Sequence, residues 1–177
     1  KEEYKIPQNT YLNSEDFSWF YVKKEMLDIF SKIRKQNKMV QLDNFSNIKT
    51  TSGCGAKSHL ITNEKVNDKQ ILKYKVLLRK TGIDLIATLD DSGIFPEQSL
   101  YFIYTEEDKN KEELVFLTGL LNSKLMNVYY RNFAITNRDA TPQLKKVDLD
   151  KFPIIMPSQQ IKGKINPIVL DLMKLQK

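Results

Sequence analysis

The stretch QILKYKVLLRKTGIDLIATLDDSGIFPEQSLYFIY, residues 70–104, decides the fold because it contains three apolar segments separated by turns. We predict strands over residues 70–79, 83–89 and 99–104, since short runs rich in leucine, isoleucine, valine and tyrosine between polar breaks are typical of β-structure. Residues 90–93, Asp-Asp-Ser-Gly, are a predicted turn, because their carboxylates can accept local backbone donors and the glycine tolerates positive φ.

Helices flank these strands in the sequence. Apolar residues recur every three or four positions over residues 13–36, over residues 111–130 and over residues 159–175. This spacing places them on one face of an amphipathic helix. We predict that the middle segment forms one long helix or two abutting helices. In the last segment we expect Pro167 to kink the helix or restart it.

The remaining segments are short strands and loops. Short strands are predicted over residues 143–147 and 152–156, and KTTSGCGAK, residues 49–57, is a predicted loop because it contains two glycines and small polar residues. Residues 132–142 are a second predicted loop, longer than ordinary connections, which is typical of functional loops. The order of elements predicts a single α+β domain with a twisted mixed or antiparallel sheet, an amphipathic helix pair and flanking N- and C-terminal helices.

Composition limits the class of protein. With 177 residues, of which 41% are hydrophobic, the chain can bury one core without metal or disulfide. The single Cys54 has no cysteine to pair with, and His59 is the only histidine, which excludes an ordinary zinc cluster and indicates a reducing compartment. No apolar run reaches the roughly 20 residues of a membrane span. Because the chain begins at Lys1 and opens with a polar segment, we expect a piece of a longer protein.

Charge is segregated along the chain. Residues 65–80 hold six basic and one acidic side chain, and residues 124–164 hold eight basic and three acidic ones. Residues 81–123 instead hold two basic and nine acidic side chains. If the fold brings the two basic segments together, they form a positive face that can replace the counterions of a phosphate backbone. The alternative is an ordinary solvated surface.

Catalytic constellations are weak in this sequence. Gly53-Cys54-Gly55 resembles the start of a nucleotide loop, but neither a third glycine nor a Gly-Lys-Ser/Thr ending follows. No Pro-Pro pair occurs, so the chain lacks the Asn/Asp-Pro-Pro-aromatic motif with which amino-methyltransferases hold a flipped base. Paired carboxylates lie in predicted turns or helices. Asp84 with Glu97 leaves open the alternative of a small metal-dependent nuclease domain.

Three segments, in this order and spacing, resemble the TaqI-like specificity domain that follows the catalytic domain of DNA adenine methyltransferases in restriction-modification systems. The first is FSNIKTTSGCGAKSHLI, residues 45–61, and the second is LRKTGIDLIATLDDSGIFPEQSLYFI, residues 78–103. The third contains LLNSKLMNVYYR, residues 120–131, and KFPIIMP, residues 151–157, which are fairly specific as a pair. The recognition domains of type I restriction specificity subunits are related.

The resemblance implies a DNA target-recognition domain that reads double-stranded DNA and is not itself an enzyme. It implies no cofactor and no metal in this fragment, and an upstream methyltransferase domain in the same chain that uses S-adenosylmethionine. The parent would be a DNA adenine methyltransferase or a type II restriction enzyme of the prokaryotic cytoplasm. We expect residues 1–38 to link to or pack on the upstream domain, residues 39–157 to recognise DNA and residues 158–177 to form a C-terminal helix. The alternative is a protein-docking module of a bacterial DNA-defence complex.

Candidate DNA-binding residues follow from residue type and position. Arginine suits guanine, and asparagine or glutamine suits adenine, in the major groove, whereas lysine suits phosphate. Arg79, Asn137 and Arg138 are the predicted base readers, with strand-end solvation as the alternative for Arg79. Lys124 and Arg131 are predicted phosphate ligands, whereas Asn122 and Ser123 are expected to cap or pack a helix junction, and the tyrosines to pack in the core. The other candidates are Lys49, Thr50, Ser52, Lys57, Ser58, Lys80, Thr81, Thr136, Thr141, Gln143, Lys145 and Lys146.

Overall fold

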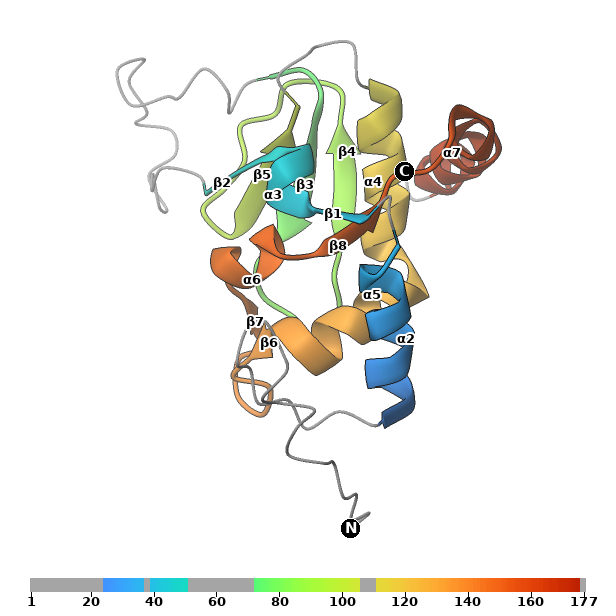
Figure 1. Cartoon of the computed structure of the whole chain (residues 1–177). Coiled ribbons are helices and arrows are strands. Elements are labelled where there is room, and N and C mark those ends of the chain that lie inside the picture. Colours follow the sequence, from blue (N-terminus) through green and yellow to red (C-terminus); the bar gives the residue numbers. More distant parts are fainter. Residues whose placement is uncertain (1–23, 37–38, 51–71, 106–110, 176–177) are drawn as a thin grey trace.

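The centre of the computed structural model is a four-stranded antiparallel sheet (Figure 1). The structure describes residues 24–36, 39–50, 72–105 and 111–175. In spatial order the strands of the sheet are β2 (Asn47–Thr50), β5 (Leu100–Tyr104), β3 (Lys75–Arg79) and β4 (Ala87–Asp90). With the helices described below, this arrangement confirms the predicted α+β class.

The central strand β3 is buried on both faces. Val76 and Leu78 belong to the main core, whereas Leu77 packs on the opposite face in a smaller cluster with Phe102 and Tyr104. The rings of those two aromatic residues stack at 5.9 Å between centroids. Burial on both faces explains why this segment reads as a continuous apolar run rather than as an alternating pattern.

Two predicted strands are shorter in the structure than expected. In the described part of the segment over residues 70–79, β3 begins only at Lys75, and β4 begins at Ala87 rather than at residue 83. Gly82 has a φ of 135° and bends the chain after β3. The backbone N–H of Leu85 then donates to the Asn127 side chain, at 2.8 Å, instead of to a neighbouring strand. This segment therefore follows the helix beside it before it enters the sheet.

A buried ion pair joins β3 to β4. Lys75 and Asp90 lie opposite each other in the strand register, and their side chains are 0% and 2% exposed. Asp90 Oδ1 also accepts from the backbone N–H and the hydroxyl of Ser92, at 3.0 and 2.8 Å, and Gly93 has a φ of 80°. The turn predicted at residues 90–93 is confirmed. The Asp90 carboxylate accepts the hydrogen bonds of the turn and also pairs with the buried Lys75.

The segment over residues 111–130 forms two helices, one of the two predicted outcomes. They are α4 (Lys111–Asn122) and α5 (Lys124–Tyr129). Ser123 caps α5, since its hydroxyl accepts from the N–H of Met126 at 3.2 Å. The Asn122 amide binds both backbone groups of Ala87 on the edge strand β4, at 2.8 and 2.9 Å. These contacts confirm the predicted helix-junction role of Asn122 and Ser123.

The chain between α5 and the C-terminal helix contains more structure than predicted. A π-helical turn η4 (Tyr130–Ala134) leads into a hairpin of β6 (Ile135–Thr136) and β7 (Gln143–Leu144). The long loop predicted over residues 132–142 is therefore confirmed over residues 137–142 and wrong over residues 132–136, which are helix and strand. The predicted strand at residues 143–147 ends at Leu144, because α6 (Lys146–Asp150) begins two residues later. Strands of two residues carry no periodicity from which they could be predicted.

The first described residues pack on the core. The part of the predicted first helix that the structure describes is α2 (Lys24–Arg34), and the earlier residues of that prediction lie outside the described residues. Phe30 of α2 is buried, with its ring 5.0 Å from that of Tyr129. A two-stranded sheet follows, which pairs β1 (Met39–Gln41) with β8 (Pro153–Ile155), and α3 (Leu42–Phe45) precedes β2. β8 confirms the strand predicted at residues 152–156.

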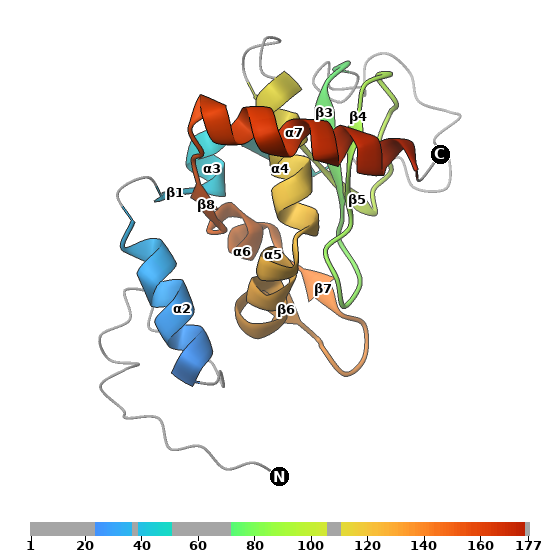
Figure 2. The same cartoon turned by 90° about the vertical axis from the view of Figure 1, so that its right-hand side faces the viewer.

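The C-terminal helix α7 (Gln159–Lys174) crosses over α4, at the end of the molecule opposite the β6–β7 hairpin (Figure 2). It continues through Pro167, so of the two outcomes expected at this residue, a kink or a restart, the restart is wrong. Lys162, Asn166 and Val169 are buried, so packing on α4 holds the helix on both sides of the proline. No helix among the described residues is long and apolar enough to cross a membrane.

The close packing of α4 and α7 gives a matched pair of glycine variants. A Cβ at Gly119 would overlap Val169 Cγ2, a stiff and buried group, whereas a Cβ at Gly163 would lie in open space. We expect Gly119→Ala to lower the free energy of unfolding by about 1 to 3 kcal/mol, and Gly163→Ala to raise it by about 0.5 to 1 kcal/mol. Urea unfolding measures both, and equal changes in the two variants would contradict this packing.

Candidate functional site

Two separately predicted segments meet at the β6–β7 hairpin. Leu144 N–H donates to the carbonyl of Lys80 at 2.8 Å, and Gly82 N–H donates to the carbonyl of Pro142 at 2.9 Å. Between these bonds Thr81 and Gln143 form an antiparallel bridge. The end of β3 therefore connects the main sheet to the hairpin, and it brings candidate residues from both segments to one surface.

Two buried tyrosine hydroxyls anchor this junction. Tyr101 donates to the carbonyl of Leu144 at 2.9 Å, and Tyr130 donates to the carbonyl of Gly82 at 2.7 Å. Burial raises the pKa of both hydroxyls; Asp150 and Asp148 add to the rise at Tyr101, while Arg79 opposes it at Tyr130. Both groups therefore remain protonated donors at neutral pH. For these two tyrosines, the prediction that they pack in the core is confirmed.

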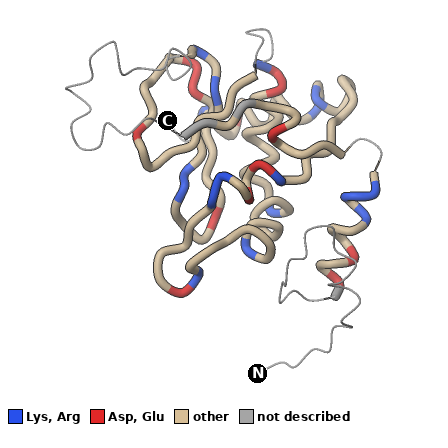
Figure 3. Tube along the Cα trace, turned by 60° about the vertical axis from the view of Figure 1, so that its left-hand side comes forward, with Lys and Arg blue, Asp and Glu red and all other residues tan. Residues whose placement is uncertain are grey.

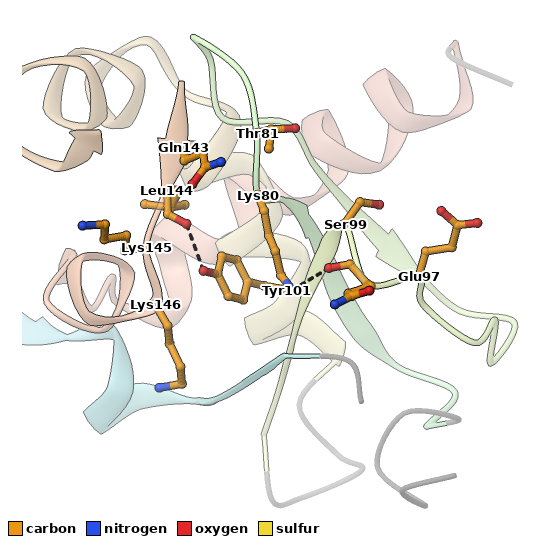
Figure 4. A pocket seen from close by; sticks show the side chains of 10 residues that line it. Lys80, Thr81, Glu97, Ser99, Tyr101, Gln143, Leu144, Lys145 and Lys146 are labelled. Atoms are coloured by element: carbon orange, nitrogen blue, oxygen red, sulfur yellow. Dashed lines mark hydrogen bonds between the residues drawn. The ribbon is translucent and has the colours of Figure 1, made fainter. Parts of the chain in front are cut away.

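A hollow of about 800 Å³ opens beside the junction (Figure 4). Its walls come from the end of β3, the connection before β5, and the segment from β7 to α6. Five candidate residues line it: Lys80, Thr81, Gln143, Lys145 and Lys146. Three polar lining residues, Glu97, Gln98 and Ser99, were not among the predicted DNA contacts. Their segment contains no basic residue and no glycine to mark it as a contact loop; only its polar composition between two predicted strands could have done so.

Lys80 is held in place within the hollow. Its Nζ donates to the carbonyl of Gln98 at 2.5 Å and lies 5.0 Å from the centre of the Tyr101 ring. Burial lowers the pKa of Lys80 below its usual value. A lysine with these contacts stabilises the connection before β5 and contributes positive potential, rather than reaching out as a flexible phosphate ligand.

Arg79 lies over the turn that follows β3. A Cβ at Gly82 would overlap the Arg79 guanidinium, so the glycine leaves the space that this side chain occupies. The positive φ of Gly82 also disfavours any other residue there. Arg79 itself is exposed, as a base-reading residue must be.

Two of the candidate basic residues have acidic partners. Arg131 pairs with Asp84, to which its Nε donates at 2.9 Å, and it also donates to the carbonyl of Ile83 at 3.3 Å. Lys146 pairs with Asp150 across one turn of α6, at 2.7 Å. These two side chains hold their own segments in place. Because a carboxylate partly neutralises each of them, they contribute less positive potential to the surface than the sequence indicated. Lys124, at the start of α5, and Lys145, before α6, are both exposed.

The tip of the hairpin projects from the body of the domain (Figure 2). Asn137 has a φ of 53°, and its carbonyl accepts from the N–H of Ala140 at 3.2 Å, which forms the turn. Arg138 and Thr141 lie on this tip and are exposed. Thr136 at the base donates its hydroxyl to the carbonyl of Gln143 at 3.0 Å. The tip thus presents an arginine on a tight turn.

The expected separation of charge is weaker in three dimensions. Lys75 is buried against Asp90, and Lys162, with its side chain 6% exposed, is buried against Glu113, so neither contributes to a positive surface. Lys65 lies outside the described residues, as do other members of the first basic segment. Figure 3 shows acidic positions among the basic ones on the side drawn there.

The candidate loop after β2 is only partly described. Lys49 and Thr50 belong to β2, opposite Phe102 and Tyr101 of β5. Ser52, Lys57 and Ser58 lie outside the described residues. For the nuclease alternative, Asp84 is paired with Arg131, and within residues 24–36, 39–50, 72–105 and 111–175 no group of three or more His, Cys, Asp or Glu side chains could hold a metal ion.

Comparison with known proteins identifies a family. The family model described as the TaqI-like C-terminal specificity domain matches residues 43–154. This range contains the main sheet, α4, α5 and the β6–β7 hairpin, and it ends before α7. No curated protein matches the chain at a significant level.

Proposed function

Because the chain belongs to the family of TaqI-like C-terminal specificity domains, we propose that it recognises a specific sequence in double-stranded DNA. One observation carries this proposal beyond the family: the end of β3 and the β6–β7 hairpin, far apart in sequence, are hydrogen-bonded into one surface that contains candidate contact residues from both. Sequence specificity requires base contacts from a rigid element. This surface is held rigid by two tyrosine hydroxyls, which donate hydrogen bonds to its backbone carbonyls.

The role proposed for each arginine and lysine follows from the exposure of its side chain and from its hydrogen-bond or ion-pair partners. Arg138, on the projecting tip, and Arg79, at the end of β3, are exposed and suited to bidentate contact with guanine. Lys124 and Lys145 are exposed cations suited to phosphate. Lys80, Arg131 and Lys146, engaged with neighbouring groups, hold the contact segments in place.

The parent protein belongs to the same proposal. We infer an upstream DNA adenine methyltransferase domain that binds S-adenosylmethionine, in a restriction-modification system of the prokaryotic cytoplasm. Methyl transfer and any cleavage would take place in the parent, and this domain would supply sequence specificity without catalysis. The domain division 1–38, 39–157 and 158–177 is part of this inference.

Salt dependence of duplex binding tests the proposal. Each phosphate contact releases counterions, so the affinity of the chain for duplex DNA should fall steeply as salt rises from about 50 to 200 mM. Lys145→Ala should weaken binding to all sequences alike and reduce the slope by about one unit. Lys174→Ala, on the exposed face of α7 at the opposite end of the molecule, is the matched control and should leave the slope unchanged. Fluorescence anisotropy measures both, and salt-independent binding would contradict DNA recognition.

A second candidate function is a protein-docking module, which one observation favours. Ile161, Ile168 and Leu172 of α7 and its C-cap residue Leu175 are exposed. Their spacings of seven, four and three residues place them along one stripe of the helix. This stripe faces away from α4 and lies beyond the residues that the family model matches. Absence of salt-dependent binding to duplex DNA would favour this alternative.

A further inference from the structure

Three polar side chains form a row across the hairpin junction. Thr136 pairs with Gln143 in the β6–β7 hairpin, and Gln143 pairs with Thr81 in the antiparallel bridge to the end of β3. We propose that this row reads bases in the major groove and that Gln143, at its centre, reads an adenine. The inference rests on the proposed function, since it names the base that the same surface would recognise.

The geometry of the pairs places all three side chains on one face. Residues directly opposite in antiparallel strands project to the same side of a sheet. The two hydrogen bonds of the bridge come from Leu144 and Gly82, which flank Thr81 and Gln143, so these two form a non-hydrogen-bonded pair, the arrangement in which side chains lie closest. Three strands at roughly 4.8 Å spacing make the row about 10 Å long, or roughly three base steps of 3.4 Å.

The exposure of the row suits a groove-reading element. Thr81 and Gln143 are exposed and line the hollow, where the Gln143 amide lies between β7 and Thr81 (Figure 4). The next residue, Leu144, is buried, so the strand directs its apolar side chain to the core and its polar one outward. Within this junction the β6–β7 hairpin is a two-stranded ribbon, an element that the major groove, about 12 Å wide, admits.

Gln143 is the member of the row that can distinguish bases. A primary amide offers one acceptor and two donors, which match adenine N6 and N7 as a bidentate pair. None of the described residues hydrogen-bonds this amide, whereas the backbone carbonyl of Gln143 accepts the Thr136 hydroxyl at 3.0 Å. Thr136 therefore fixes the backbone beneath the amide without engaging the amide itself. The threonine methyl groups on either side are suited to a thymine methyl.

The anchoring of the row makes its contacts specific. Leu144, beside Gln143, is held by the hydroxyl of Tyr101, and Gly82, beside Thr81, is held by the hydroxyl of Tyr130. Both hydroxyls belong to buried residues of the main core. Because the backbone is held firmly, the Gln143 amide cannot shift to fit a different base. It therefore distinguishes base edges by the geometry of their hydrogen bonds.

The experiment is selection from a random duplex library with the full chain, applied to the wild type, Gln143→Ala, Gln143→Glu and a control, Gln160→Ala. Gln160 is an exposed glutamine near the start of α7, away from the hairpin. We expect the wild type to enrich a motif with a fixed adenine. Gln143→Ala should lose preference at that position alone by about 5- to 150-fold, one good bidentate contact. Gln143→Glu should favour cytosine there, because a carboxylate accepts from cytosine N4.

The outcomes separate the two proposals. If the wild type enriches a motif and Gln143→Ala enriches the same one unchanged, the row does not read adenine, while DNA recognition stands. If Gln143→Ala weakens all positions equally and its thermal unfolding is unchanged, Gln143 is not a reader of one base and the inference is overturned. If the wild type enriches no motif, the proposed function itself fails. Gln160→Ala must match the wild type in each case.

Discussion

Asp90→Ala is expected to lower the free energy of unfolding by about 3 to 5 kcal/mol, because it leaves the Lys75 ammonium buried without its carboxylate. Both side chains are almost fully buried, with Lys75 0% and Asp90 2% exposed. The same substitution removes the acceptor of two Ser92 donors and so loosens the turn before β5. Chemical denaturation of both proteins at neutral pH measures the difference.

Asp91→Ala is the control for this substitution, since the neighbouring carboxylate is exposed. Its expected effect lies within about 0.5 kcal/mol of zero, as for ordinary surface changes. A loss of the same size in both variants would mean that the turn, and not the buried ion pair, stabilises this part of the sheet.

The pH dependence of the wild type follows from the same pair. Burial alone would raise the pKa of Asp90, but the hydrogen bonds from Lys75 and Ser92 and the charge of Lys75 outweigh burial and hold the pKa below the ordinary value of 3.8. A carboxyl with a lowered folded-state pKa stabilises the fold above its unfolded value and loses this contribution as pH falls through the folded one. The stability difference between wild type and Asp90→Ala should therefore be constant near neutrality and shrink below about pH 4.

Replacing Arg138 and Gln143 together by alanine is expected to remove most of the sequence discrimination. Each bidentate contact is worth about 1 to 3 kcal/mol, and separated positions add, so the double variant should lose roughly 2 to 6 kcal/mol of the difference between preferred and unrelated duplexes. Arg138 lies on the hairpin tip and Gln143 at its base, and both are exposed, so folding should be preserved. Competition binding with the two duplexes measures the difference.

Lys124→Ala is the control for the double variant. Lys124 is exposed at the start of α5 and is suited to phosphate contact, so its loss should weaken preferred and unrelated duplexes by the same factor. If the double variant behaves in this way, with discrimination unchanged, the hairpin does not read sequence.

Much of the fold could be predicted because strong local patterns determine it. The apolar runs of β3 and β5, the repeating leucines of α4 and the Asp-Asp-Ser-Gly turn each identify an element without reference to the rest of the chain. The hairpin β6–β7 could not be predicted from such patterns, since its strands have two residues each and its pairing depends on Lys80 and Gly82 from a distant segment.

Only part of the candidate site could be predicted, because it too depends on pairing between segments that are distant in the sequence. Thr81 and Gln143 were both candidates, but nothing in the sequence indicated that they lie opposite each other. The numbers of basic and acidic residues in each segment overestimate the positive surface charge where a lysine pairs with a carboxylate of another segment. Lys162 is paired with Glu113, 49 positions earlier, and Lys75 with Asp90, 15 positions later. Burial of these pairs removes their charge from the surface, and only the packing of α7 on α4 and of β3 beside β4 reveals it.

The ratio of affinities for a selected and a scrambled duplex, measured at physiological salt with the full chain, tests the central claim most directly. A sequence-specific domain should bind the selected duplex at least about 10³-fold more tightly than the scrambled one. A ratio near one, with both affinities falling equally as salt rises, would show that this surface binds DNA only through its charge and does not read sequence.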